Sequence, residues 1–519
     1  MCGILGFWAR QSVPTLEQID VLFRHAEKRG QDGVGVYVDG EIYRSMLPYH
    51  KCRDEVLAFV QEHLRLGSVL LGICRATPET EEPTHDRTYV QPVSFEDVVL
   101  VHNGGVADFI LDDLGLRGKV KIDSEAIPVA YYRFHKNTKS MMEYLVGSFS
   151  VAMHDQGRNR LILISSFNPL AHGYRCGLGY VIASDVEAVQ EFLGWNRTGV
   201  AVWEDYYFDV LPPYAIVETD LTSGFQTWHD YKPRFIFDGK DIETEPGKVK
   251  YLVSASGGVD SGLTAFLLKK AGYDVEMVHF RYGHRGQDAE HWAAERLAKE
   301  IGCGFRLISL ENVYHQIGQI GMLLDSTRPI TSGEELLKST TAWVPGRNAV
   351  FMALLLSRAE ALVLSERYDQ VTVCGGWAQL SEETGGYPDN SFHFHRAVDY
   401  LRQVGYITGH HLSLANVLAN LTKTEEWWLG YQLGFPFQYT VSCDNPRMDE
   451  KGPILCTECG STRLSVWAAQ RAGVPDPRRF YGPPVPPKAL PPWRPDPKDL
   501  VVRLNLPDEA RERILAELD

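Results

Sequence analysis

Short apolar runs and longer stretches with helical spacing alternate through the middle of the chain. The apolar runs at 251–253, 275–280 and 306–310 have the length and β-branched content of buried strands. Helical spacing follows the first two runs, over residues 263–268 and 288–301. A longer apolar helix, beginning near Ala349, precedes a fourth strand that starts at Val371. This alternation predicts an α/β domain with a doubly wound parallel sheet, in which ligands bind beyond the carboxyl ends of the strands.

The first of these strands ends in a run of small and polar residues. Its two glycines let backbone N–H groups approach phosphate oxygens closely, and the N-terminus of the following helix adds partial positive charge. The serine hydroxyls can donate hydrogen bonds, and the aspartate can hold Mg²⁺ or fix the loop. For two glycines alone, the alternative is a tight turn of any α/β protein. The nucleotide-binding candidates are Ser256, Gly257, Gly258, Val259, Asp260 and Ser261.

The complete string Ser-Gly-Gly-Val-Asp-Ser resembles the pyrophosphate loop of the N-type ATP pyrophosphatases, which activate a carbonyl oxygen by adenylation. The resemblance implies ATP and Mg²⁺ as cofactors. The string lacks the lysine of a Walker A loop, which disfavours transfer of a γ-phosphate.

The bulk properties of the chain limit its organisation and its location. With 519 residues it is too long for one hydrophobic core, so we expect two large domains with smaller additions. A net charge of −15 disfavours a protein that coats DNA but leaves room for a local basic groove. No apolar run approaches the length of a membrane span, and the N-terminus lacks the features of a signal peptide. Nine cysteines in such a chain favour reduced thiols, a nucleophile or a metal site, and we expect a cytoplasmic protein with no membrane partner.

A cysteine, Cys2, directly follows the initiator methionine. Removal of the methionine would leave Cys2 with a free α-amino group, whose reference pKa of about 7.7 suits it to act as base for the thiol. Four further motifs follow in order: 29–33 (Arg-Gly-Gln-Asp-Gly), 72–76 (Gly-Ile-Cys-Arg-Ala), 101–105 (Val-His-Asn-Gly-Gly) and 122–125 (Ile-Asp-Ser-Glu). Singly, each has a structural explanation, since Asn-Gly-Gly is a good hairpin turn and Arg75 could be a surface residue of a strand.

As an ordered set these motifs resemble the N-terminal-nucleophile (class II) glutamine amidotransferases, whose domain is a four-layer αββα sandwich. The resemblance implies that Cys2 attacks the amide of glutamine. It implies that Asn103 and the Gly104 N–H form the oxyanion hole. It also implies that Arg75 binds the substrate carboxylate, a task suited to a guanidinium fork, and that Asp123 holds the substrate ammonium.

The second half carries its own motifs in a fixed order: 280–283 (Phe-Arg-Tyr-Gly), 344–348 (Val-Pro-Gly-Arg-Asn), 386–389 (Gly-Tyr-Pro-Asp), 442–443 (Ser-Cys), 456–459 (Cys-Thr-Glu-Cys) and 472–477 (Ala-Gly-Val-Pro-Asp-Pro). This order resembles the 7-cyano-7-deazaguanine synthases of the queuosine pathway. The resemblance implies adenylation of a substrate carboxylate and attack by ammonia. Arg347, Asn348, Tyr387 and Asp389 would contact the acceptor or the nucleotide, and Lys423 could neutralise phosphate. The alternatives are a loop ion pair for Arg347 and a solvated helix residue for Lys423.

The same family carries four cysteines near its C-terminal end, and Thr462 stands at the fourth position here. Cys443, Cys456 and Cys459 remain as metal ligands, whereas a closed structural zinc site has four. Two outcomes stay open: zinc is kept with another ligand, such as Asp444 or a distant histidine, or it is lost.

These motifs divide the chain into four parts. We expect an amidotransferase domain at 1–235, a polar linker at 236–247, a synthase-like domain at 248–482 and a proline-rich tail at 483–519. The tail should form an extended strap on the surface and end in a short helix from Pro507 to Leu518.

Two further departures from the synthase family concern the substrate loops. Arg281 stands in place of an aspartate, and Asn390-Ser391 stands in place of Cys-Arg, which indicates a substrate other than the free carboxylated base. We predict a glutamine-dependent amidotransferase that channels ammonia to a 7-deazaguanine. The leading acceptor is the nitrile of 7-cyano-7-deazaguanine in tRNA or DNA, which would become an archaeosine-type formamidine. The alternatives are ATP-consuming synthesis of free 7-cyano-7-deazaguanine and a non-catalytic binding protein; a homodimer stays open.

Overall fold

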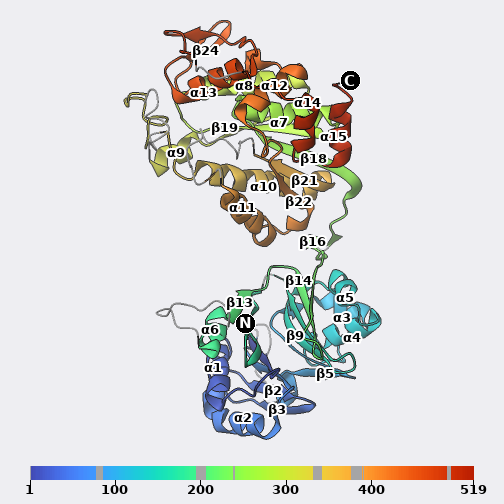
Figure 1. Cartoon of the computed structure of the whole chain (residues 1–519). Coiled ribbons are helices and arrows are strands. Elements are labelled where there is room, and N and C mark those ends of the chain that lie inside the picture. The colour runs from blue at the N-terminus through green and yellow to red at the C-terminus, as the bar shows by residue number, and fades with distance from the viewer. Residues whose placement is uncertain are drawn as a thin grey trace. The chain divides into compact units, whose positions relative to one another are not determined.

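The computed structural model describes residues 2–77, 86–166, 168–194, 206–237, 240–318, 320–330, 342–375, 389, 391–487 and 492–518. The chain forms two compact units, Met1–Asp241 and Ile242–Asp519, each with its own hydrophobic core (Figure 1). The segment expected to be a linker contains two short paired strands, β16 (Ile236–Phe237) and β17 (Lys240–Asp241), and the first residues of β18 (Glu245–Ser254).

The first unit contains two antiparallel sheets. The seven-stranded sheet, in the order β13-β11-β12-β1-β4-β2-β3, consists of β1 (Gly3–Trp8), β2 (Val34–Val38), β3 (Glu41–Ser45), β4 (Val69–Cys74), β11 (Ala171–Arg175), β12 (Gly179–Ala183) and β13 (Tyr206–Val210). The six-stranded sheet, in the order β15-β14-β10-β9-β6-β5, consists of β5 (Val93–Phe95), β6 (Val98–His102), β9 (Ser150–Asp155), β10 (Arg160–Ser165), β14 (Ala215–Asp220) and β15 (Gln226–Asp230). The short strands β7 (Gly105–Val106) and β8 (Gly147–Ser148) pair with each other.

Strand β1 shows why the two sheets stack. Its side chains alternate between two apolar surroundings, because successive residues of a strand point to opposite faces. Leu5 and Phe7 pack among the helices α1 (Leu16–Glu27), α2 (Tyr49–His63) and α6 (Val186–Leu193). Ile4 and Trp8 pack against the other sheet. Helices α3 (Asp108–Asp113), α4 (Ala126–Arg133) and α5 (Thr138–Tyr144) cover the second sheet, so the unit is the expected αββα sandwich.

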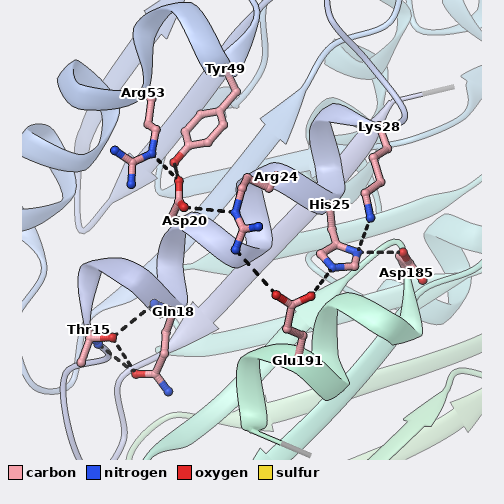
Figure 2. A network of polar contacts seen from close by, with 10 residues as sticks. All are labelled: Thr15, Gln18, Asp20, Arg24, His25, Lys28, Tyr49, Arg53, Asp185 and Glu191. Carbon is pink, nitrogen blue, oxygen red and sulfur yellow. Dashed lines mark hydrogen bonds and ion pairs between the residues drawn. The ribbon is translucent and has the colours of Figure 1, made fainter. Parts of the chain in front are cut away.

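A polar network fixes helix α1 against its neighbours α2 and α6 (Figure 2). The Asp20 carboxylate accepts hydrogen bonds from Tyr49 Oη at 2.7 Å and from Arg53 Nε at 2.7 Å, both on α2. Burial raises the pKa of Asp20, but these donors outweigh it and hold the pKa below its ordinary value. His25 contacts two carboxylates near α6, those of Asp185 (3.1 Å) and Glu191 (2.8 Å). The C-terminal turn of α1 is thereby held beside the start of β1.

The second unit is built on a five-stranded parallel sheet in the order β20-β19-β18-β21-β22. Besides β18 its strands are β19 (Asp274–Arg281), β20 (Gly304–Ser309), β21 (Tyr368–Cys374) and β22 (Leu412–Ala415). Tyr251 and Val253 of β18 face a core built with α7 (Val259–Lys270), α8 (Gln287–Ile301), α12 (Lys423–Gln432) and α13 (Gly460–Ala472). Leu252 faces the opposite core, built with α9 (Glu311–Ile317), α10 (Arg347–Glu366) and α11 (Phe392–Gly405). Helices on both faces confirm the predicted doubly wound sheet.

Two sequence expectations about this unit need correction. The C-terminal tail is not a surface strap, because α14 (Pro497–Arg503) and α15 (Asp508–Leu515) bury Leu500 and Ile514 completely in the core beside α7. Helix α10 is also long and apolar enough to cross a membrane by length and composition alone, which the sequence analysis did not expect. Its residues Leu355, Ala359 and Leu362 are buried in the core behind the sheet.

Smaller elements complete the second unit. A three-stranded sheet, separate from the central one, consists of β23 (Arg447–Asp449), β24 (Gly452–Cys456) and β25 (Phe480–Tyr481). Single 3₁₀ turns lie at η6 (Gly409–His411) and η7 (Phe437–Tyr439) in this unit, and at η1 (Arg87–Tyr89) and η2 (Asp123–Glu125) in the first.

Candidate active sites

The residues predicted to process glutamine come together in the first unit. Cys2, Arg75, Asn103, Gly104 and Asp123 all line one cavity of about 650 Å³. They come from the start of β1, the end of β4, the end of β6 and the turn η2. Segments far apart in sequence therefore converge on one site, although the role of each residue is still an expectation.

The position of Cys2 is set by the residue that follows it. A Cβ added to Gly3 would lie 2.3 Å from the carbonyl oxygen of Ala26, so only glycine lets β1 pass this close to α1. The Cys2 sulfur accepts a hydrogen bond from the Ala76 N–H at 3.4 Å. Burial raises the pKa of the Cys2 thiol, and the Ala76 N–H and the charge of Arg75 act against that rise without cancelling it. The thiol is thus neutral at neutral pH and needs a base before it can attack.

The two residues expected to form the oxyanion hole, Asn103 and Gly104, lie at the end of β6. The Asn103 backbone is held by its exchange of hydrogen bonds with Ser150, at 2.8 and 3.0 Å. Its side-chain Nδ2 is buried and has no hydrogen-bond partner in the part of the chain that the structure describes. Gly104 has φ +151°, and a Cβ there would lie 1.8 Å from the carbonyl oxygen of Ser148. A buried donor without a partner is costly unless a ligand satisfies it, which fits an oxyanion hole.

The cavity also has groups suited to both ends of an amino acid. Arg75 is buried, and its Nη1 donates to Thr77 Oγ1 at 2.9 Å. Asp123 Oδ2 accepts a hydrogen bond from the Val106 N–H at 2.6 Å, which fixes the carboxylate in the cavity wall. A guanidinium and a carboxylate in one cavity match the carboxylate and ammonium of an α-amino acid.

Sequence reasoning missed the buried group that supports this wall. His102 Nδ1 lies 2.9 Å from Ser124 Oγ, and Gln91 joins the two by bonding the His102 backbone at 2.6 Å and the serine hydroxyl at 3.1 Å. Burial lowers the pKa of His102, so the ring is neutral at neutral pH. His102 and Ser124 belong to the sequence motifs 101–105 and 122–125, but Gln91 lies outside every motif, and only the fold brings the three side chains together.

In the second unit the predicted nucleotide loop forms the wall of a cavity of about 300 Å³ between the end of β18 and α7. Ser256 Oγ accepts a hydrogen bond from the Gly258 N–H and lies 3.3 Å from Ser261 Oγ. Gly257 has φ +78°, and a Cβ there would lie 2.6 Å from the carbonyl oxygen of Glu290. The glycine is therefore needed both for the turn and for the close contact of the loop with α8.

Lys423 faces this cavity and is not the solvated helix residue that was the alternative. Its Nζ forms an ion pair with Asp260 of the loop and lies 3.7 Å from the Glu426 carboxylate. Burial lowers the pKa of Lys423, but the two carboxylates outweigh it and raise the pKa above its ordinary value. The ammonium is consequently charged, and it is paired with these two carboxylates. Burial, together with the charge of Asp260, raises the pKa of Glu426 well above its ordinary value.

Arg347 lies at the start of α10, and its Nη1 donates to Tyr282 Oη at 3.3 Å. The Tyr282 ring stacks on the His284 ring with centroids 4.1 Å apart, and His284 Nε2 lies 3.1 Å from Glu290 Oε2. These four side chains line the 300 Å³ cavity, and Asn348 lines an adjoining one of about 200 Å³. Sequence reasoning named Arg347 and Asn348 but not the histidine or the glutamate.

Of the other two predicted acceptor residues, the structure describes Asp389 but not Tyr387. Asp389 is near enough to Arg347 for the arginine charge to lower its pKa, although burial outweighs this and the pKa is raised. Tyr387 lies outside the described residues. Arg281 lines neither cavity, because Glu311 and Asp288 bind its guanidinium, each at 2.9 Å. Arg281 therefore gives no support to a substrate different from that of the synthase family.

The three cysteines predicted to bind metal form a buried cluster. The sulfurs of Cys443, Cys456 and Cys459 all lie within 4.8 Å of one another. Backbone N–H groups of Cys456, Asp444 and Thr462 donate to these sulfurs at 3.1 to 3.4 Å. The Thr462 hydroxyl donates to the Ser442 carbonyl at 2.9 Å, whereas the carboxylate atom Asp444 Oδ2 is buried without a hydrogen-bond partner among the described residues.

Comparison with known proteins decides the family of the second unit. The family profile described as "Queuosine biosynthesis protein QueC" matches residues 250–471. The 7-cyano-7-deazaguanine synthase of Nitratiruptor sp. is 31% identical over 228 residues, which are 44% of this chain and 97% of that protein. The chain belongs to the QueC family. Within that family it has a longer relative, the 7-cyano-7-deazaguanine synthase of Saccharolobus solfataricus, which is 27% identical over 481 residues, 88% of this chain and 94% of that protein.

Among solved structures, a glutamine phosphoribosylpyrophosphate amidotransferase from B. subtilis aligns with a TM-score of 0.34 and 15% identity, over 80% of this chain and 91% of that chain. The QueC match ends before α14 and α15 and begins after the αββα unit, so the family profile covers one of the two sites.

Proposed function

We propose that this QueC-family chain is a glutamine-dependent amidotransferase that uses ATP to replace oxygen by nitrogen on a 7-deazaguanine. One observation carries the proposal. The residues expected to process glutamine share one cavity, while Ser256, Gly258, Val259 and Asp260 of the pyrophosphate loop line a cavity in the unit that matches QueC.

In the first step, the α-amino group of Cys2, freed by removal of the methionine, takes the thiol proton. The thiolate attacks the glutamine amide carbon, and Asn103 Nδ2 with the Gly104 N–H stabilises the oxyanion. The amide nitrogen takes the proton and leaves as ammonia, and water then hydrolyses the thioester to glutamate. Arg75 and Asp123 hold the two ends of the substrate amino acid.

In the second step, an oxygen of a carboxylated deazaguanine attacks the α-phosphorus of ATP and displaces pyrophosphate. Ammonia then displaces AMP and gives the amide. A second round removes the remaining oxygen as AMP and gives the nitrile, so each oxygen lost consumes one ATP. The loop N–H groups and Lys423 would bind the phosphates, and Asp260 with the serine hydroxyls offers the oxygen ligands that Mg²⁺ prefers.

A second acceptor is supported by one departure from the family. The resemblance implies an arginine at position 391, but Ser391 caps helix α11 by accepting the Phe394 N–H at 3.1 Å. An arginine at this position could pair with a carboxylate of the acceptor, so its replacement by serine favours a substrate without a free carboxylate. Such a substrate is the nitrile of 7-cyano-7-deazaguanine in tRNA or DNA, to which ammonia adds without ATP to give a formamidine. The retained nucleotide loop is the reason for placing this acceptor second.

The cysteine cluster fits a structural zinc ion, because three buried sulfurs with backbone N–H donors are the ligand chemistry that zinc selects. Cys443, Cys456 and Cys459 would hold it, and Asp444 Oδ2, which has no hydrogen-bond partner among the described residues, is a candidate fourth donor; Asp444 Oδ1 accepts from Ser461 Oγ at 2.8 Å. A bound zinc ion would cross-link the end of β24 to the start of α13.

Mass spectrometry of the product tests the proposal. The full chain is incubated with amide-¹⁵N glutamine, ATP and either carboxylated deazaguanine or tRNA that contains the nitrile. We expect ATP-dependent ¹⁵N incorporation into the free base. Cys2→Ala should abolish incorporation from glutamine and retain incorporation from ¹⁵N-ammonium. Incorporation into tRNA alone would select the second acceptor, and no glutamine hydrolysis by the unmodified chain would select a non-catalytic binding protein.

A further inference from the structure

The cavity beside the nucleotide loop contains a histidine–glutamate pair that the phosphate chemistry leaves unused. His284 is 4% exposed and follows strand β19, and Glu290 lies on α8. Both line the cavity together with Ser256, Asp260 and Arg347. The pair is therefore close to the groups that bind nucleotide in the proposed function.

The geometry distinguishes the two ring nitrogens of His284. Nε2 lies 3.1 Å from Glu290 Oε2, at the distance of an ion pair but without the geometry of a hydrogen bond. Nδ1 is buried and has no hydrogen-bond partner among the described residues. The Tyr282 ring, stacked at 4.1 Å and tilted by 14°, restricts rotation of the imidazole. An imidazole held this way has Nδ1 without a partner among the described residues, and the nearby Glu290 carboxylate stabilises the imidazolium that forms when Nδ1 accepts a proton.

Charged and titratable groups surround the pair, and they include Asp260, Lys423 and Asp444, which line the same cavity. His279 of β19 and Arg347 of α10, with His284, hold the pKa of Glu290 below its ordinary value, although burial acts to raise it. Burial raises the pKa of Tyr282 to about 12, so its hydroxyl stays neutral. Glu290 is thus the ionised group that faces the imidazole from α8.

We propose that His284 Nδ1 is the general base of the ammonia-transfer step, with Tyr282 and Glu290 as its positioning residues. This inference rests on the proposed function. When ammonia attacks the adenylated carbon, a C–N bond forms and the carbon–oxygen bond to AMP breaks. The nitrogen must lose one proton, which passes to Nδ1 and then to solvent. Adenylation itself needs no base of this kind, because the attacking carboxylate is already ionised.

The two half-reactions can be measured separately. Acceptor-dependent ATP–pyrophosphate exchange reports adenylation alone, and product formation from ammonium reports the transfer step. In the full chain, His284→Asn and His284→Gln should keep exchange within about threefold of wild type and lower product formation by about 100-fold or more. Glu290→Gln should lower the rate of product formation and move the rising limb of its pH profile. His411→Asn is the matched control, since His411 binds the Asp369 carbonyl at 2.9 Å and should leave both rates unchanged.

The outcomes distinguish a failure of this inference from a failure of the proposed function. Product formation within about threefold of wild type in both His284 variants would overturn the inference, as would equal losses of exchange and product. If the wild-type chain itself forms no product with either acceptor, the proposed function fails first. If the wild type acts on the nitrile without exchange, no adenylated carbon forms and the inference is overturned.

Discussion

Replacement of Gly104 by alanine should disable glutamine hydrolysis without unfolding the first unit. The added Cβ would lie 1.8 Å from the carbonyl oxygen of Ser148 and 2.8 Å from His102 Nε2. Real Cβ contacts stay above 3.0 Å, so the backbone must shift by about 1.2 Å or more to relieve the first contact alone. This shift would displace the Gly104 N–H, which is proposed to stabilise the oxyanion.

The size of that shift gives the expected loss. Displacement of a reacting group by about 1 Å can cost about 100-fold in rate, and loss of one oxyanion donor costs about 100- to 1,000-fold. We therefore expect kcat/KM for glutamine hydrolysis to fall by about 100-fold or more in Gly104→Ala. Product formation from added ammonium should be unchanged, because it does not use this site.

The assay is glutamate release at a series of glutamine concentrations, with thermal unfolding measured in parallel. Gly115→Ala is the matched control, because Gly115 also has a positive φ (+67°) but a Cβ there meets no atom within 4 Å. The control measures the cost of the left-handed backbone alone, about 1–2 kcal/mol, and should keep full hydrolysis. A folded Gly104→Ala protein that hydrolyses glutamine within about threefold of wild type would refute the assigned oxyanion hole.

Three further predictions concern the second unit. Lys423→Met should weaken ATP binding by about tenfold, measured by calorimetry, because Asp260 loses its partner and the phosphates lose a cation; glutamine hydrolysis should not change. Arg347→Lys removes the guanidinium that bonds Tyr282 and should raise the KM for the acceptor or ATP by about tenfold, and an unchanged KM would remove Arg347 from the site. Burial raises the pKa of Glu276, but ion pairs with two arginines outweigh it and hold the pKa below 4.5. The folded chain then binds this proton more weakly than the unfolded chain, so the stabilisation is present above about pH 4.5 and is lost as the pH falls. Urea unfolding should show the difference between wild type and Glu276→Gln shrinking from about pH 7 to about pH 3.5.

Local sequence was enough to predict the elements that carry the loops. The strand that ends at Ser254, the glycines after it and the helix from Val259 follow from apolar runs and breakers, and the structure has them at the expected positions. The doubly wound sheet follows as well, because strands that alternate with helices pair in parallel. The prediction for the tail was wrong because its prolines indicate an extended chain on the surface. Leu500 and Ile514 are buried because they pack into the core beside α7, which the local sequence does not reveal.

Motif order in the sequence named residues that the structure brings together in each cavity, because a phosphate-binding turn needs glycines and a nucleophilic site needs a thiol. It did not assign a role to His102, His284 or Glu290. Tertiary structure decided everything that depends on approach between distant segments. It placed the Glu290 carboxylate beside the His284 ring, and it paired Arg281 with Glu311 and Asp288. The physical reason is that pKa values and hydrogen-bond partners depend on distances of a few ångströms, which packing of whole helices and strands sets and local sequence does not.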